Sequence, residues 1–312
     1  MSYRGRFAPS PTGDLHIGSA ATALIAWLRA RQAGGELVLR VEDIDTPRVV
    51  AASEALQLDD LHWLGLDWDE GPDIGGEYGP YRQSERSFLY EDALAKLAAA
   101  GLTYLCDCSR SDIASIASAP HSGDEGPRYP GTCRRLGMQR RDWRRPPAVR
   151  LAVPDREVIV DDVFQGELRQ NVFVSVGDFV LKRGDGIYAY QLAVVVDDLA
   201  MAITEVVRGA DLLRSAPRQA LLAELLGERP RRYAHAPLVV DGDGQRLQKR
   251  NPRHTLRGLR ALGVAPEAVL AQLAQTLGLD GDHHFASITL RTLLTKANLT
   301  NVRGRVEIRL PS

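Results

Sequence analysis

The opening of the chain alternates short apolar runs with one long apolar stretch. Tyr3–Ala8 is predicted to be a short strand, followed by a loop rich in proline and glycine. An apolar helical stretch over Gly18–Arg31, a stop at Gly34 and Gly35 and a strand over Glu36–Glu42 come next. A strand, helix and strand in this order form a β-α-β unit, whose strands lie parallel. The pattern therefore predicts an α/β fold that binds a ligand at the carboxyl ends of parallel strands.

The middle of the chain continues with helices and strands. Helices are predicted over Ala51–Leu64 and over Ser87–Ala100, the second of which is halted by Gly101. Apolar and polar residues then alternate through Val149–Val163.

A hairpin is predicted where Phe179–Lys182 and Ile187–Tyr190 flank an Arg-Gly-Asp-Gly turn, because Asp-Gly tolerates positive φ. A helix from Gln191 towards Leu199 and a strand over Ile203–Val207 would restore the α/β alternation.

The last part of the chain begins with an apolar run, Leu238–Val240, before a charged loop and two helical runs. Gly263 lies just past the first run, Pro266 opens the second and Gly278 closes it, which is the usual asymmetry of helix ends. From Asp280 onward the periodicity is weak, and no element is predicted.

Composition excludes several classes of protein. With 312 residues, the chain has room for about two domains of roughly 150 residues each. Hydrophobic residues make up 44% and charged residues 25%, which excludes a disordered chain or a coiled coil. Because the net charge is -1, any contact with RNA must come from a local basic face. The longest uncharged apolar run, Ala20–Leu28, is too short for a membrane span, and no secretory signal opens the chain, so we expect a cytoplasmic protein.

The segment Ser10–Ser19 joins the first strand to the first helix, where backbone N–H groups and the helix dipole favour phosphate. His16 can donate a hydrogen bond to a phosphate as its charge shifts, and Gly18 removes a side chain where adenine or ribose would pack. The alternative is a proline and glycine loop that holds a histidine by chance.

Together, Arg6–Gly13 and Leu15–Gly18 resemble the ATP signature of class I aminoacyl-tRNA synthetases, in particular the glutamyl and glutaminyl branch. The resemblance implies a second ATP element, a mobile lysine loop, which falls here at Arg246–Arg250. Two departures are present. Ser19 stands where many class I enzymes have a second histidine, and the loop has arginine and glutamine where the family has lysine and small serines.

Lys249 is one of only four lysines in the chain, against thirty-five arginines. A compact ammonium can neutralise a transferring phosphate where a planar guanidinium would fit differently, although a solvated loop lysine is the alternative. The resemblance implies that His16, Gly18 and Lys249 bind ATP, which carries Mg²⁺, and take part in catalysis.

The resemblance also implies an L-glutamate pocket. Glutamate has two carboxylates and one ammonium. By the resemblance, Arg6, Arg208 and Tyr190 bind the carboxylates and Glu42 binds the ammonium. Arginine suits this role because its guanidinium can bind a carboxylate bidentately. Taken singly, these residues fit surface ion pairs or ordinary packing, but their surrounding segments recur in the family's order. The implied substrate set is Arg6, Phe7, Ala8, Pro9, Ser10, Glu42, Tyr190 and Arg208.

Three cysteines, Cys106, Cys108 and Cys133, lie in an irregular insert and can supply thiolates to zinc. Their odd number and close spacing suit a metal site better than disulfides, with three unrelated buried cysteines as the alternative. Ligand chemistry alone favours His121 as the fourth ligand, whereas the resemblance implies Tyr129, which we prefer. Since such a set is closed, the zinc would be structural.

The insert is followed by an arginine-rich stretch around Trp143, which fits either RNA phosphates or a solvated surface. Its arginines are Arg134, Arg135, Arg140, Arg141, Arg144 and Arg145.

The expected fold is a class I synthetase-type, Rossmann-like parallel sheet with a zinc-binding insert and a small C-terminal helical part. We expect the two halves of the catalytic domain at 1–100 and 151–250, the zinc-binding and acceptor-side region at 101–150, and the helical region at 251–312. The 62 residues after Arg250 (312 minus 250) are too few for an anticodon-binding domain.

This shortened layout resembles the glutamyl-Q tRNA(Asp) synthetases, which implies transfer of glutamate to the queuosine base in the anticodon of tRNA(Asp). Two alternatives remain: a short glutamyl-tRNA synthetase that charges the tRNA 3′ end, and a non-catalytic descendant that binds RNA or protein. We expect a monomer.

Overall fold

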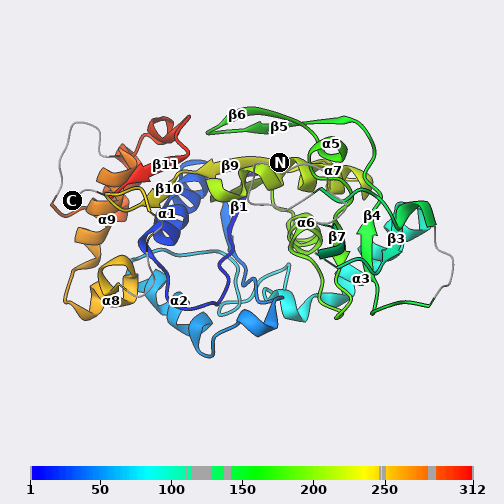
Figure 1. Cartoon of the computed structure of the whole chain (residues 1–312). Coiled ribbons are helices and arrows are strands. Elements are labelled where there is room, and N and C mark those ends of the chain that lie inside the picture. The colour runs from blue at the N-terminus through cyan, green and yellow to red at the C-terminus, as the bar shows by residue number, and fades with distance from the viewer. Residues whose placement is uncertain are drawn as a thin grey trace.

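The protein is described by a computed structural model covering residues 2–109, 111–113, 128–136, 142–245, 247, 251–279 and 286–310. Its centre is a six-stranded sheet in the order β2-β1-β8-β9-β5-β6 (Figure 1). The first five strands run parallel, and β6 is antiparallel to β5. In sheet order the strands are Glu36–Leu39, Arg4–Phe7, Glu205–Gly209, Arg232–Ala236, Glu157–Asp162 and Gly166–Asn171.

The order of the strands places a binding crevice at β1. The chain runs from β1 to β2 on one side and later returns to β8 on the other side. In open parallel sheets, ligands bind at the carboxyl ends of the strands where the order reverses in this way.

Helix α1 (Ile17–Gln32) connects β1 to β2 and is buried on nearly all sides. It is rich in alanine and leucine, which favour helix, and the His16 side chain caps its first turn by accepting a hydrogen bond from the Ser19 amide. A helix that is apolar all round must be covered on both faces. The sheet covers one face of α1, and α9 (Pro266–Leu277) and α10 (Leu290–Lys296) cover the other.

A second apolar core lies around α6 (Tyr190–Ala200), which contacts both α3 (Ser87–Ala99) and α7 (Ala216–Leu225). Helix α2 (Ser53–Trp63) supports the loop after β1, because the Ser53 hydroxyl and the Gln57 amide donate to the Gly13 carbonyl at 2.8 and 2.7 Å. These contacts from α2 therefore fix the position of the loop that precedes α1.

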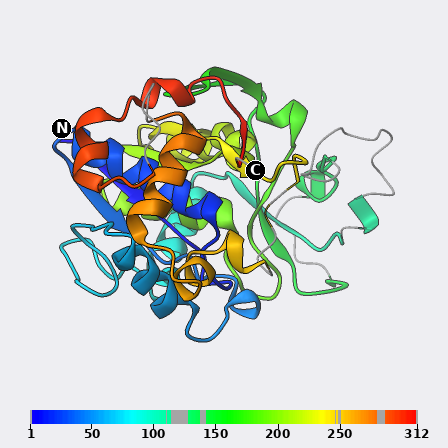
Figure 2. The same cartoon turned by 90° about the vertical axis from the view of Figure 1, so that its left-hand side faces the viewer.

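The insert and the C-terminal helices lie at opposite ends of the molecule (Figures 1 and 2). A three-stranded antiparallel sheet carries the insert; its strands are β3 (Thr103–Cys106), β4 (Ala148–Leu151) and β7 (Val180–Lys182). The short α5 (Val172–Ser175) follows β6, and α8 (Leu256–Ala261) begins the C-terminal helices. None of the described helices combines the length and apolarity that crossing a bilayer needs.

A small parallel pair joins two distant parts of the chain. Strand β10 (Leu238–Val240) pairs with β11 (Glu307–Arg309), and the Leu310 amide donates to the Val240 carbonyl at 2.9 Å. Because β10 leads directly towards the predicted lysine loop, β11 supports the base of that loop.

Most predicted elements are confirmed, with three differences. The predicted hairpin forms only in part: the Arg183 amide donates to the Ile187 carbonyl and the Ala189 amide to the Leu181 carbonyl, both at 2.8 Å, but the second arm is a single bridge at Tyr188, and Tyr190 begins α6. The alternating stretch Val149–Val163 splits between β4 and β5, which belong to different sheets. The region without a prediction after Asp280 contains α10 and β11, and β6, α7 and β9 are further elements that the sequence pattern did not reveal.

Candidate active site

A cavity of about 690 Å³ lies at the carboxyl ends of β1 and β8, against the start of α1. It brings together all ten residues of the predicted substrate and ATP sets that the structure describes. These are Arg6, Phe7, Ala8, Pro9, Ser10, His16, Gly18, Glu42, Tyr190 and Arg208.

Of the predicted lysine loop, Arg246–Arg250, the structure describes only Leu247. Lys249 therefore lies outside the described residues. Leu247 lines the cavity, and Thr255, which follows the loop, makes a β-bridge with His16. Leu247 before Lys249 therefore lies at the cavity, and Thr255 after it contacts a residue that lines the cavity.

His16 and Gly18 depend on each other. The Nδ1 atom of His16 accepts a hydrogen bond from the Ser19 amide at 3.1 Å. A Cβ atom added at Gly18 would lie 3.1 Å from this Nδ1 atom and 3.7 Å from the Cβ atom of Val239. The missing side chain thus gives room to the His16 ring itself, whereas the sequence suggested room for the nucleotide.

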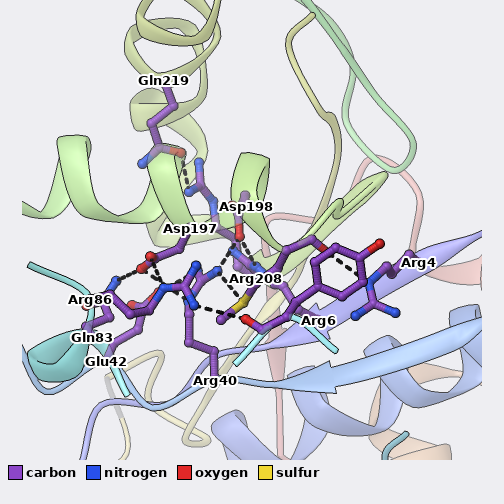
Figure 3. Close-up of polar contacts among 12 residues, drawn as sticks. Arg4, Arg6, Arg40, Glu42, Gln83, Arg86, Asp197, Asp198, Arg208 and Gln219 are labelled. Atoms are coloured by element: carbon purple, nitrogen blue, oxygen red, sulfur yellow. Dashed lines mark hydrogen bonds and ion pairs between the residues drawn. The ribbon is translucent and has the colours of Figure 1, made fainter. Parts of the chain in front are cut away.

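Arg40 is fully buried at the centre of a charge network beneath the cavity (Figure 3). Its Nη1 atom lies 2.6 Å from Asp198 and its Nη2 atom 3.0 Å from Glu42, and its Nε atom faces Asp197 at 3.8 Å. Sequence reasoning missed Arg40. The signal was a single charge inside the apolar run of residues 37–41, directly after the end of β2.

Asp197 and Asp198 come from the last turn of α6; both face Arg40, and each also pairs with a second arginine. Asp197 accepts hydrogen bonds from Arg86 Nε at 2.6 Å and Gln83 at 2.8 Å, and Asp198 lies between Arg40 and Arg6. Burial opposes the charge of Asp198, but the positive charges of Arg40 and Arg6 outweigh burial and lower the pKa of this carboxyl. The Asp198 carboxylate therefore stays ionised.

Glu42 has the opposite balance. Burial raises the pKa of its carboxyl above the ordinary value, although Arg40 and Arg6 act to lower it. A cation that entered the cavity beside Glu42 would supply the missing positive charge and favour the carboxylate. Glu42 can thus attract an ammonium group.

Arg208 points from β8 into the same cavity and is held on several sides. Its Nε atom donates to the Nε2 atom of His235 at 3.0 Å, and its Nη1 atom donates to Gln219 at 2.6 Å and to the Tyr190 hydroxyl at 3.5 Å. His235 and Gln219 were also missed, because nothing in their local sequence marks them as partners of Arg208.

The three cysteines form a cluster that could hold a metal ion, since their Sγ atoms lie within 4.8 Å of one another. The Tyr129 hydroxyl lies 3.4 Å from Cys106 Sγ and 3.9 Å from Cys108 Sγ, and the Sγ atoms of Cys108 and Cys133 are 3.6 Å apart. In a tetrahedral site with Zn–S bonds of about 2.3 Å, sulfur atoms lie about 3.8 Å apart. The spacing of these atoms fits such a site. His121 lies outside the described residues.

The arginine-rich stretch after the insert is partly engaged with acidic residues. Arg144 pairs with Asp112 at 3.2 Å, and Arg134 pairs with Asp178 at 3.2 Å. Arg140 and Arg141 lie outside the described residues. The choice between an RNA surface and a solvated surface stays a prediction.

The parallel sheet with its cavity ahead of α1 defines a class I synthetase core. The family model for the catalytic domain of class I tRNA synthetases (E and Q) matches residues 2–304, and the chain belongs to this family.

Several relatives are named glutamyl-Q tRNA(Asp) synthetase. The chain is 52% identical to that of Symbiobacterium thermophilum, covering 88% of this chain and 86% of the relative. It is 49% identical to that of Nitratidesulfovibrio vulgaris, over 89% and 87%. A glutamate–tRNA ligase 2 of Acidithiobacillus ferrooxidans is 44% identical over 92% of this chain but only 59% of its own length.

A solved structure has a similar fold. A glutamate tRNA ligase from Elizabethkingia meningosepticum, crystallised with its amino acid, superposes with a TM-score of 0.83 at 28% identity. This match covers 100% of this chain and 67% of the other.

Replacing Arg40 by methionine should lower the free energy of unfolding by about 3–5 kcal/mol, because three buried carboxylates would lose a shared partner. Urea unfolding measures this change. The control is Arg169→Met, whose pairs with Glu157 and Glu167 are half exposed and should contribute at most about 1 kcal/mol. Equal losses in the two variants would contradict the central role of Arg40.

Proposed function

We propose that this chain activates L-glutamate with ATP and transfers the glutamyl group to the queuosine base in the anticodon of tRNA(Asp). The observation that carries the proposal is the meeting of Arg6, Arg208 and Glu42 in one cavity with His16. This set offers two positive groups and one negative group, which complement the two carboxylates and the ammonium of glutamate.

The amino acid is held by charge matching. Arg6 and Arg208, with the Tyr190 hydroxyl, receive the carboxylates, and Glu42 receives the ammonium. Arg6 donates to the Val207 carbonyl and lies 3.4 Å from Asp198, so its position is fixed before substrate arrives. Such preorganisation reduces the ordering that binding must otherwise impose.

In the first step, an oxygen of the glutamate α-carboxylate attacks the α-phosphorus of ATP. A new bond forms between this oxygen and phosphorus, and the bond to the β-phosphate oxygen breaks, so that pyrophosphate leaves with the electron pair. His16 at the start of α1 and Lys249 stabilise the charge that moves across the phosphates. Mg²⁺ on the ATP phosphates supplies further positive charge.

In the second step, the oxygen of a queuosine ring hydroxyl attacks the carbonyl carbon of the mixed anhydride and forms an ester bond. The bond from this carbon to the phosphate oxygen breaks, AMP leaves with the electron pair, and the hydroxyl proton passes to solvent. The anhydride is already reactive, so positioning of the hydroxyl supplies much of the rate. The identity of 52% to a glutamyl-Q tRNA(Asp) synthetase, against 44% to a glutamate–tRNA ligase, supports queuosine as the acceptor.

We also propose that Cys106, Cys108, Cys133 and Tyr129 hold one structural zinc ion. The Tyr129 side chain is buried beside the three thiols, and the Arg150 guanidinium lies 4.0 Å from the centre of its ring. With four protein ligands, the metal would have no position for substrate.

Glutamate-dependent exchange of labelled pyrophosphate into ATP tests the first step. We expect exchange by the wild type and a loss of about 100-fold or more in Lys249→Ala, as when one donor to a transition-state oxyanion is removed. Lys296→Ala, at the end of α10, is the matched control and should retain full exchange. A silent wild type would favour a non-catalytic RNA-binding protein, and an active Lys249→Ala would remove Lys249 from the chemistry.

Labelled glutamate, ATP and tRNA(Asp) with or without queuosine identify the acceptor. We expect label only on the queuosine-containing tRNA, because an unmodified transcript lacks the ring hydroxyls. Label on queuosine-free transcripts would instead indicate charging of the 3′ end. In that case, periodate treatment, which destroys the terminal ribose diol, should abolish the label.

Metal analysis by mass spectrometry should find one zinc per chain, and Cys133→Ser should reduce it. Under challenge with a chelator, we expect Tyr129→Phe to lose zinc faster than the wild type, because it lacks the hydroxyl oxygen. Tyr104→Phe is the control, since the Tyr104 hydroxyl donates to Asp178 at 2.6 Å. Equal retention in the two variants would rule out Tyr129 as a ligand.

A further inference from the structure

His235 is a fully buried histidine that none of the steps above uses. It lies in β9 directly opposite Arg208 of β8. Its Nε2 atom accepts from Arg208 Nε at 3.0 Å, and its Nδ1 atom lies 2.5 Å from the Asp162 carboxylate. The three side chains thus form a chain from the end of β5 to the cavity.

The chemistry of the two partners determines where the His235 proton resides. A guanidinium only donates hydrogen bonds, so Nε2 must be the unprotonated acceptor. A carboxylate only accepts, so Nδ1 must carry the proton and donate it to Asp162. Burial, with a smaller contribution from the charge of Arg208 and against the opposing effect of Asp162, lowers the pKa of His235 to about 4. The ring is therefore neutral near pH 7 and has one proton.

Asp162 is a rigid anchor because backbone groups hold it. The amides of Phe164 and Gln165 donate to its Oδ1 atom at 3.0 and 2.9 Å, and the His235 amide donates to Oδ2 at 3.2 Å. Burial acts to raise the pKa of Asp162, but the hydrogen bond from His235 and these amides lower it. The carboxylate stays ionised and cannot rotate without losing several bonds.

The Arg208 guanidinium is oriented by the hydrogen bond from Arg208 to His235 and by the ring of Tyr233. Four acceptors take four of its five N–H groups: His235, Gln219, Tyr190 and the Leu212 carbonyl. The Tyr233 ring lies 5.1 Å from the guanidinium carbon and stacks on His235 at an angle of 12°. The plane of the guanidinium is thereby fixed with the Nη1 edge towards Tyr190.

We propose that Asp162 and His235 are positioning residues that fix the Arg208 guanidinium, and with it the remaining N–H group of Nη2, for a ligand carboxylate, through the Nδ1-protonated form of His235. The identity of that carboxylate as glutamate rests on the proposed function. The orientation of Arg208 does not, because it follows from contacts within the protein.

The protonation of His235 is tested directly by nitrogen NMR on protein labelled in its histidines, with His235→Gln assigning the signal. We expect Nδ1 protonated and Nε2 unprotonated between about pH 6 and 8, since the pKa lies well below this range. A proton on Nε2, or titration within this range, would overturn the proposal. This measurement needs no substrate and therefore stands even if the proposed function fails.

Two substitutions separate positioning from simple packing. His235→Gln places an amide oxygen near the Nε2 position and keeps the acceptor for Arg208. His235→Asn places its amide near the Nδ1 position, so it keeps the donor to Asp162 but loses that acceptor. His62→Asn is the control, because His62 pairs with Asp73 at the surface.

The readout is the KM for glutamate and for ATP in pyrophosphate exchange, with thermal unfolding in parallel. We expect His235→Asn to raise the glutamate KM about 10- to 100-fold while the KM for ATP changes less than about twofold, and His235→Gln to stay near the wild type. Equal glutamate KM values for the two variants at similar thermal stability would refute the positioning role. If the wild type shows no exchange, the proposed function fails. The NMR result alone then decides whether His235 has the protonated form that positions Arg208.

Discussion

Positive side chains that must face a substrate inside a cavity have to be neutralised from behind, and this constraint organises the structure. Arg6 lies in β1, Arg208 lies in the neighbouring β8, and Arg40 directly follows β2 on the other side of β1. Asp198 lies between Arg6 and Arg40, and Arg40 also reaches Glu42. Since buried charges are stable only when paired, the helix that supplies the aspartates must sit over the ends of these strands.

The same constraint explains why α6 packs where it does. Its apolar residues enter the second core, and its last turn delivers Asp197 and Asp198 to the arginines. Packing and charge thus fix the helix together. The result is a cavity whose cationic groups are already oriented, as electrostatic recognition of a small anion requires.

Much of the fold follows from local pattern, and much of the site follows from family motifs. The β-α-β opening and α6 were predictable because each contains an apolar run long enough for its element. Strand β9 escaped because it mixes Arg232, Tyr233 and His235 with alanine, so its burial comes from tertiary packing and leaves no alternation. The supporting residues escaped for another reason: Arg40 and Asp198 are separated by 158 positions, and His235 and Asp162 by 73. No local spacing encodes such pairs.

The pairing of β10 with β11 has a mechanical meaning. Two short strands close a ring of chain that contains the lysine loop and the helices α8, α9 and α10. The pairing of β10 with β11 resists displacement of one strand along the other, since several backbone hydrogen bonds must break at once before the strands slide. The helices α8, α9 and α10 are thereby anchored beside the cavity, which β10 helps to line, because both ends of the ring meet at this pair of strands.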